Sequence, residues 1–164
     1  MKKAFYAGSF NPITKGHLNV IHQASNLFDE VIVAVMLNSS KKNSFFTLEE
    51  RVELVRKTVE NLDNVQVVTG QGASYKLAKL YECQAMIRGL RGVTDFDSEI
   101  QLATTNRKLS NRELSTICLF PDQEYQYISS SIVRELFALD EPIDDYVEPV
   151  VEEAMVKKYK CQRW

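Results

Sequence analysis

The sequence predicts an α/β domain with a Rossmann-like, doubly wound sheet of five parallel strands and helices on both faces. Short apolar, β-branched runs alternate along the chain with longer stretches of helical period, as expected for strands joined by crossover helices. The 164 residues are 45% hydrophobic and 26% charged, which suffices for one core. No repeat, low-complexity segment or linker divides the chain. We therefore expect a single domain over residues 1–164.

The predicted strands are short apolar runs. In doubly wound sheets, ligands bind at the carboxyl ends of the strands, where the winding reverses. The loops after the first, second, fourth and fifth strands are therefore the segments in which we look for function. In chain order, the predicted strands are Ala4 to Ala7, Val31 to Leu37, Val65 to Val68, Ala85 to Ile87 and Thr116 to Phe120.

Helices are predicted between these strands, and two more follow the last strand. The second helix has the clearest start, because Thr47-Leu48-Glu49-Glu50 is a capping box whose hydroxyl and carboxylate accept from reciprocal backbone donors. Its next helical face reads Arg51, Leu54, Val55 and Thr58. The helices between the strands are predicted at about Gly16 to Phe28, Leu48 to Asn61, Ser74 to Tyr81 and Asp95 to Leu109.

Charge and hydropathy exclude several classes of protein. A formal net charge of −2 argues against a general nucleic-acid binder, which needs a basic excess to displace counterions from phosphates. No apolar stretch approaches the ~20 residues of a membrane span. The apolar run at the N-terminus is interrupted at Gly8-Ser9, too early for a signal peptide. We expect a soluble protein with neither nucleic acid nor membrane as a partner.

The cysteines point to a reducing compartment. Cys83, Cys118 and Cys161 are odd in number and widely spaced, and they form no C-x-x-C pair for zinc or redox chemistry. We interpret them as reduced thiols of a cytoplasmic protein. Cys83 and Cys118 stand beside or within apolar runs and are expected to be small core residues.

A donor-rich loop, Gly8 to His17, joins the first strand to the first helix. Its glycines let the backbone approach a ligand, and the helix start supplies unpaired N–H groups, to which Ser9 and Thr14 add side-chain donors. The loop matches neither the P-loop nor the dinucleotide-binding fingerprint, so kinase and dehydrogenase readings lose their main support. The loop therefore predicts a phosphate-binding site made of backbone and side-chain donors.

His17 stands in the first turn of that helix, where the helix dipole disfavours a positively charged imidazole. A neutral donor toward phosphate fits this position, and a structural capping role fits it equally well. His22, the second of the two histidines, is expected on the surface or in packing.

Basic residues follow two further strands. Lys41 and Lys42 lie in a polar loop after the second strand, where solvated surface and an anion role are both open. Arg88 and Arg91 follow the fourth strand with glycines between them, which suits bidentate binding of phosphate oxygens. Ion pairs of these arginines with acids of the next helix are the alternative, and both roles can hold at different arginines.

The helix after the arginines carries two stripes of side chains. One is expected to be mostly core and consists of Phe96, Ile100, Ala103 and Arg107. The other mixes acid, amide and leucine, which fits a pocket wall as well as a solvent face, and it consists of Asp95, Glu99, Leu102 and Asn106.

A serine run after the fifth strand, Ser129 to Ser131, precedes an apolar helical segment. It predicts an N-cap and a second donor-rich helix start, because capping alone accounts for one serine and not for three. The sequence carries no nucleophile elbow G-x-S-x-G, no H-E-x-x-H and no D-x-D metal cluster. Basic and neutral donors dominate, which favours phosphoryl or nucleotidyl transfer by positioning and charge stabilisation over covalent catalysis.

Two of these segments resemble a known superfamily. Thr14-Lys15-Gly16-His17 is similar to the T/H-x-G-H signature of the nucleotidyltransferases, and the segment from Ile128 to Arg134 is similar to their second signature, I-S-S-[ST]-x-x-[RK]. Within that superfamily, the chain resembles the bacterial phosphopantetheine adenylyltransferases over nearly its whole length. The further matching segments are Gly8 to Ile13, Ser40-Lys41-Lys42, Phe46 to Arg51 and Ile87 to Arg91.

The resemblance implies transfer of AMP from ATP to 4′-phosphopantetheine, which gives dephospho-coenzyme A and pyrophosphate in coenzyme A biosynthesis. It implies Mg²⁺ carried with ATP, no metal site of the protein's own, and a homohexamer. Chemistry is implied for His17, Lys41, Arg88 and Arg91, with His17 stabilising the pentacovalent α-phosphorus. Contacts with 4′-phosphopantetheine are implied for Ser9, Lys41, Ser74, Arg88, Leu102 and Asn106. Contacts with ATP are implied for Ser9, Phe10, His17, Gly89, Leu90, Arg91, Glu99, Tyr125, Gln126, Tyr127, Ile128, Ser129, Ser130 and Ser131.

Two departures from the family pattern stand out. The chain has Asn11 where the family usually has aspartate, which alters the charge beside two anionic substrates. The loop from Lys42 to Phe46 is one residue longer than is common, which bears on the reach of Lys41. The alternatives are a nucleotidyltransferase of the same fold with another nucleotide or acceptor, and a nucleotide-binding sensor that has lost turnover.

Overall fold

The computed structural model describes residues 1–37 and 44–162. Its strands form one sheet in the order β3-β2-β1-β4-β5, and every neighbouring pair is parallel. The predicted fold class, a five-stranded doubly wound parallel sheet, is thereby confirmed. The strands are β1 Lys3–Gly8, β2 Glu30–Leu37, β3 Val65–Gln71, β4 Ala85–Gly89 and β5 Ser115–Leu119.

The strands and helices lie where the sequence predicts them, with small shifts at their ends. β3 runs three residues further than predicted, because its ladder with β2 continues to the pair Leu37 and Gln71. α2 ends earlier than predicted, at Thr58, and Val59 caps it by donating its backbone N–H to Val55. The helices are α1 Lys15–Leu27, α2 Leu48–Thr58, α3 Ser74–Leu80, α4 Val93–Leu109, α5 Ser130–Ala138 and α6 Pro149–Gln162, and a 3-10 helix spans Gln123–Tyr125.

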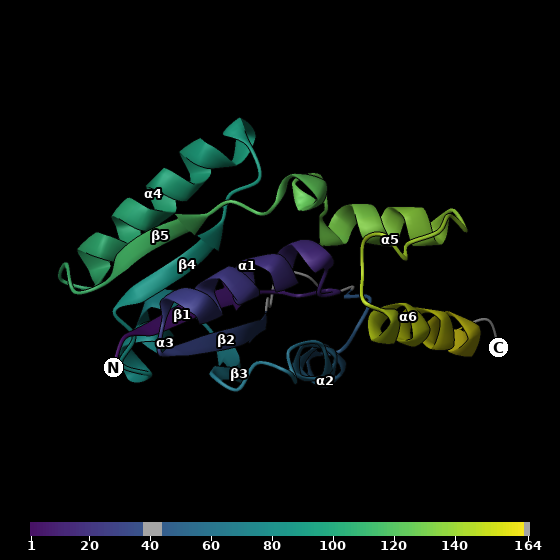
Figure 1. The fold of residues 1–164 in the computed structure, drawn as a ribbon, viewed down its shortest axis with the longest axis horizontal. Coiled ribbons are helices and arrows are strands. Elements are labelled where there is room, and N and C mark those ends of the chain that lie inside the picture. Colours follow the sequence, from purple (N-terminus) through teal and green to yellow (C-terminus); the bar gives the residue numbers. More distant parts are fainter. Residues whose placement is uncertain (38–43, 163–164) are drawn as a thin grey trace.

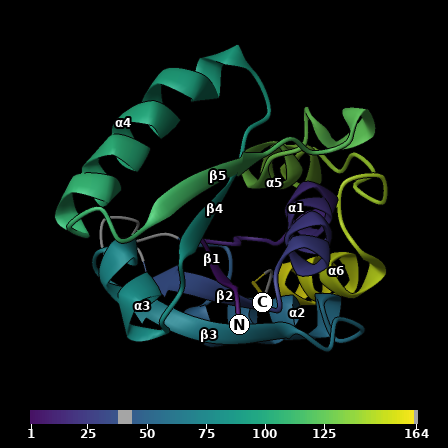
Figure 2. The same cartoon turned by 60° about the vertical axis from the view of Figure 1, so that its left-hand side comes forward.

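Helices lie on both sides of the sheet (Figures 1 and 2), and an apolar cluster packs against each of its faces. On one face, Val33 and Ile87 pack in a cluster that contains side chains of α1, α2, α5 and α6. On the other face, Phe5 and Ile32 pack with Ala78 of α3. Helices therefore lie on both faces, as predicted. None of the described helices is long and apolar enough to cross a membrane.

Several residues of α4 and β5 that were predicted to be buried in the core are exposed. Helix α4 lies beside the edge strand β5 (Figure 2), and the side chains expected to be core on α4 are largely exposed: Phe96 is 49% and Ile100 47% accessible. Cys118 of β5, also predicted to be core, is exposed, whereas Cys83 is buried as predicted. The predictions of core positions on α4 and at Cys118 were wrong for one reason: among the described residues, no element covers this side of α4 and β5.

Candidate active site

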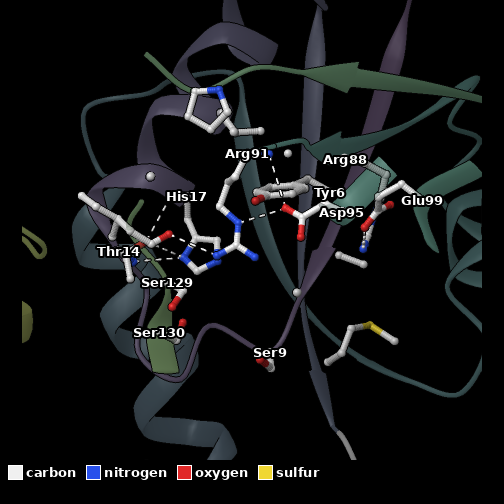
Figure 3. Close-up of a pocket in the computed structure, with 18 of the residues that line it drawn as sticks. Tyr6, Ser9, Thr14, His17, Arg88, Arg91, Asp95, Glu99, Ser129 and Ser130 are labelled. Carbon is white, nitrogen blue, oxygen red and sulfur yellow. Dashed lines mark hydrogen bonds and ion pairs between the residues drawn. The ribbon is translucent and has the colours of Figure 1, made fainter. Parts of the chain in front are cut away.

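A cleft of about 740 Å³ opens at the carboxyl ends of β1 and β4 (Figure 3). These two strands are neighbours in the sheet although they are far apart in sequence, so the winding reverses between them. Doubly wound sheets bind ligands at this point. The walls come from the β1–α1 loop, the end of β4 with the start of α4, and the start of α5.

The β1–α1 loop is fixed by buried contacts. Phe10 has φ 45°, a left-handed conformation that is uncommon for a bulky residue, and its ring is buried between Tyr6 and His17, with ring centroids 5.6 and 5.1 Å away. The Asn11 side chain is also buried and its Oδ1 accepts the backbone N–H of Phe46 at 3.0 Å. The loop is therefore held before any ligand binds.

His17 is both a capping residue and part of the cleft wall. The Thr14 backbone N–H donates to His17 Nδ1 at 3.1 Å, and the His17 N–H donates to Thr14 Oγ1 at 3.3 Å, which completes a capping box. Because Nδ1 accepts a hydrogen bond, the proton of the neutral ring sits on Nε2. Burial, with a smaller contribution from the charge of Arg91, lowers the pKa of His17 to about 4. His17 is therefore a neutral Nε2–H donor at the cleft, while His22 is exposed.

Arg51 supports the same wall from behind. The residue is 3% accessible, and its Nη1 donates to the carbonyl oxygens of Ser9 at 2.7 Å and Met36 at 3.1 Å. Its Nε donates to the carbonyl oxygen of Thr47 at 3.3 Å. Within the described part of the chain no carboxylate forms an ion pair with Arg51, and burial lowers the pKa of its guanidinium. One buried cation thus ties together the ends of β1 and β2 and the start of α2.

The two arginines after β4 line the cleft and also form ion pairs with α4. Arg88 donates through Nε and Nη2 to the two carboxylate oxygens of Glu99, at 2.6 and 2.7 Å. Arg91 Nε lies 3.3 Å from the Oδ2 of Asp95. All four side chains border the cleft, so the ion pairs that the sequence left open are present, and binding of phosphate by the same arginines stays a prediction. Each acid thus holds its arginine at the wall of the cleft.

Each serine at the start of α5 has a different partner. Ser129 Oγ accepts the N–H of Ile132 and caps the helix. Ser130 Oγ donates to the carbonyl oxygen of Pro12 at 2.7 Å, which holds this helix start against the β1–α1 loop. Ser131 Oγ accepts a hydrogen bond from Arg134 Nη2 at 3.4 Å. All three serines border the cleft, and their contact with phosphate stays a prediction.

The structure brings together many of the predicted site residues and leaves others outside. Those that line the cleft are Ser9, His17, Ser74, Arg88, Gly89, Arg91, Glu99, Ile128, Ser129, Ser130 and Ser131. Those that do not are Phe10, which packs behind His17, Leu90, Leu102, Asn106, Tyr125, Gln126 and Tyr127. Lys41 lies outside the described residues.

Sequence reasoning missed, among others, two polar residues that shape the site, one in the cleft wall and one behind it. Tyr6 lines the cleft although it stands inside an apolar strand, and the only signal is a polar-tipped aromatic near the carboxyl end of that strand. Arg51 lies on the apolar face that it shares with Leu54 and Val55. A cation in such a stripe needs a buried partner, and this was the available signal.

The cleft supplies hydrogen-bond donors and cationic side chains, and no cysteine is among the described residues that line it. Burial raises the pKa of the Cys83 thiol to about 11, and burial also raises that of Cys118. No group of three or more His, Cys, Asp or Glu side chains suited to a metal is found among the residues that the structure describes. The arrangement suits the stabilisation of charge on phosphate oxygens.

Comparison with known proteins agrees with this chemistry. Residues 5–136 match the family model described as cytidylyltransferase-like. A phosphopantetheine adenylyltransferase of Thermodesulfovibrio yellowstonii is 42% identical over 159 residues, which cover 97% of this chain and 98% of that protein. One of Finegoldia magna is 45% identical over 152 residues, which cover 92% of this chain and 93% of that protein.

Solved structures share the fold at low identity. A candidate nicotinate-nucleotide adenylyltransferase of Vibrio parahaemolyticus superposes with a TM-score of 0.69 at 20% identity, covering 96% of this chain and 93% of that one. A lipopolysaccharide core biosynthesis protein of Thermoplasma volcanium gives 0.54 at 19% identity over 74% of this chain and 97% of that one. The motifs, the cleft and the relatives agree, and the chain belongs to the cytidylyltransferase-like family and, within it, to the phosphopantetheine adenylyltransferases.

Proposed function

We propose that this nucleotidyltransferase moves the AMP part of ATP onto the phosphate of 4′-phosphopantetheine, forming dephospho-coenzyme A and releasing pyrophosphate. The observation that carries the proposal is the cleft, in which two helix starts and two arginines converge at the point where the sheet winding reverses. The names of relatives at 42 and 45% identity over almost the whole chain support these particular substrates.

The proposed reaction is an in-line displacement. A phosphate oxygen of 4′-phosphopantetheine attacks the α-phosphorus of ATP, and the bond from that phosphorus to the oxygen that bridges to the β-phosphorus breaks, so that pyrophosphate leaves with the electron pair. The attacking oxygen is already anionic, and therefore no general base is needed. The protein contributes by holding the reactants together and stabilising charge.

Within the cleft, we assign His17 Nε2–H to an oxygen of the α-phosphoryl group as charge builds on it. Arg91 and the serines of the α5 start would bind ATP phosphates, because all of them border the cleft and Arg91 Nη1 donates to the carbonyl oxygen of Ile128, next to those serines. Arg88, in β4, and Ser74, at the start of α3, would bind 4′-phosphopantetheine, as the resemblance to the family implies. A role for Lys41, and contacts of the pantetheine arm with Leu102 and Asn106, stay predictions.

Mg²⁺ is proposed to arrive as part of the ATP complex. Bound to phosphate oxygens, it would neutralise charge on the leaving pyrophosphate. The carboxylates that border the cleft in the described structure, Asp95 and Glu99, are each paired with an arginine, which supports a metal carried by the substrate over one held by the chain.

We further propose that the chain works as a homohexamer in the cytoplasm. The apolar side chains Val93, Phe96 and Ile100 of α4 are 90%, 49% and 47% accessible, and such a contiguous patch is typical of a subunit contact. The free thiols of Cys83 and Cys118 fit a reducing compartment. Light scattering that gives the mass of a single chain would overturn the proposed assembly.

A pyrophosphate-release assay tests the proposed reaction. The purified protein is incubated with Mg²⁺ and either ATP or CTP, each with 4′-phosphopantetheine or with other phosphorylated acceptors. We expect rapid release only with ATP and 4′-phosphopantetheine together, and mass spectrometry should identify dephospho-coenzyme A. Preference for CTP or for another acceptor would contradict the proposal. Tight ATP binding without release in the presence of acceptor would indicate the sensor alternative.

A further inference from the structure

Tyr6 is a buried polar group that the proposed reaction has not yet used. It lies near the carboxyl end of β1, the central strand, and is only 6% accessible. Its ring packs edge-on against Phe10 and belongs to the core beneath α1. Its hydroxyl has no hydrogen-bond partner among the residues that the structure describes, although no fully buried polar atom there is left unsatisfied. The hydroxyl therefore opens toward the cleft that Tyr6 lines.

Two cationic side chains flank the hydroxyl. Figure 3 shows the Tyr6 ring between Arg88 and Arg91, whose charges lower the pKa of Tyr6 while the charge of Glu99 raises it. The oxygen also lies close to Gly89: a Cβ added there would be 3.8 Å from it and 3.2 Å from Val20. A glycine at this position keeps the space in front of the hydroxyl open to a ligand.

The hydroxyl stays protonated under all physiological conditions. Burial raises the pKa of Tyr6 to about 12, against a smaller opposing effect of the two arginines. A protonated hydroxyl that opens to the cleft offers one donor to a bound ligand. The arginines on either side of it favour an anionic acceptor.

We infer that the Tyr6 hydroxyl donates a hydrogen bond to a phosphate oxygen of a bound substrate, at the place where the phosphates held by Arg88 and Arg91 meet. The inference rests on the proposed function, and it adds a substrate-contacting residue to the cleft. A neutral donor here orients the phosphate without adding charge beyond that of the arginines. A structural hydroxyl, in contrast, would have a partner within the protein.

The variant Tyr6→Phe removes the hydroxyl and keeps the ring that packs on Phe10. Calorimetry would measure binding of Mg²⁺-ATP and of 4′-phosphopantetheine separately, and initial rates of pyrophosphate release would give kcat/KM. A donor to a charged acceptor is expected to be worth on the order of 10-fold to 100-fold. We expect a loss of that size in kcat/KM or in one binding constant, while the melting temperature of the ligand-free protein stays unchanged.

Tyr146→Phe is the matched control, because Tyr146 packs against the same core but does not line the cleft. The inference is overturned if Tyr6→Phe keeps binding constants and kcat/KM within about twofold of the parent protein. A lower melting temperature of the ligand-free variant would also overturn it, since the hydroxyl would then have a structural partner. If the parent protein binds ATP but shows no turnover, the proposed function fails, whereas the binding comparison still tests Tyr6.

Discussion

The starts of α1 and α4 border the same cleft, yet the described chain fixes only the first of them firmly. The α1 start has a complete capping box between Thr14 and His17, and Phe10 and Arg51 are buried behind it. The α4 start has no side-chain cap, and Val93 in its first turn is 90% accessible. The α1 wall of the cleft is therefore held in place by contacts within the described chain. The α4 wall has fewer such contacts and an exposed apolar side chain in its first turn.

This difference suggests how the two walls act. On the α1 side, donors are positioned before substrate arrives, which is how electrostatic catalysis avoids reorganisation during reaction. On the α4 side, Arg88 and Arg91 form ion pairs with acids of α4, so a shift of that helix would also move the two arginines. We expect substitutions behind the α1 wall to alter turnover directly, and substitutions on the outer side of α4 to act through subunit contacts.

The largest effect is expected at the α1 wall, for His17→Ala. The substitution removes the Nε2–H donor, and the loss of one well-placed donor to developing charge typically lowers kcat by about 10²–10³. Steady-state pyrophosphate release measures this change, and circular dichroism checks that the fold is intact. His22→Ala, on the same helix but exposed, is the control and should leave kcat unchanged. Near-normal turnover of His17→Ala would remove His17 from the mechanism.

Arg51→Gln should have the next largest effect. It leaves the carbonyl oxygens of Ser9, Met36 and Thr47 without their buried donor, which is expected to cost roughly 2–4 kcal/mol of unfolding free energy. Urea denaturation measures that cost. Because the Ser9 carbonyl is released, we also expect kcat/KM to fall about tenfold at temperatures where the variant is folded. Arg51→Lys, which keeps the charge, should recover part of both.

On the α4 wall, Ile100→Glu places a charge on the exposed apolar patch without touching the cleft. A desolvated, unpaired carboxylate opposes association, so the variant should be smaller than the parent protein by light scattering. We expect activity to fall several-fold, roughly in step with the loss of assembly. Asp97→Asn, on the same helix, is a control. An unchanged mass for Ile100→Glu would show that this patch is not a subunit contact.

A smaller effect, on stability, follows from the lowered pKa of His17. Its folded value is about 4 and its unfolded value about 6.5, so the unfolded chain binds more protons between these two pH values. Stability is therefore retained above pH 6.5 and lost as pH falls toward 4, by on the order of 3 kcal/mol from this group. Urea titrations at several pH values should show this contribution in the parent protein and its absence in His17→Gln.

The smallest effect is expected for Asn11→Asp, which restores the residue usual in the family. Of the Asn11 side chain, only Oδ1 is used in the described contacts, as the acceptor of the Phe46 N–H, and a carboxylate oxygen accepts equally well. We predict kcat/KM within about threefold of the parent protein. A larger change would mean that the charge at this position acts on the substrates.

Most of the fold was predictable, because the periodicity of apolar residues and the helix-capping residues indicate the same strands and helices along the chain. The Thr47 and Glu50 capping box predicted the start of α2, and it is present. The side of α4 that faces solvent was not predictable. A stripe such as Phe96 and Ile100 shows that a face is apolar but not whether this chain or another covers it.

The site was predictable where motifs expose polar groups after a strand, as at His17 and Arg88. It was not predictable where a polar group is hidden among apolar ones. Tyr6 and Arg51 have the sequence context of core residues, and only tertiary structure shows that one opens to the cleft and that the other reaches three carbonyl oxygens. Ion pairs of the arginines with acids of α4 were one of the alternatives in the sequence, and only the structure shows that Arg88 takes Glu99 as its partner.

Direct transfer between two bound substrates is the central claim, and the configuration at the transferred phosphorus tests it most directly. With ATP made chiral by sulfur at the α-phosphorus, one in-line displacement inverts that centre, whereas a covalent nucleotidyl-enzyme requires two displacements and retains it. We predict inversion in the thio-substituted dephospho-coenzyme A, read by phosphorus NMR. Retention would contradict the account, because it would require a protein nucleophile in the cleft.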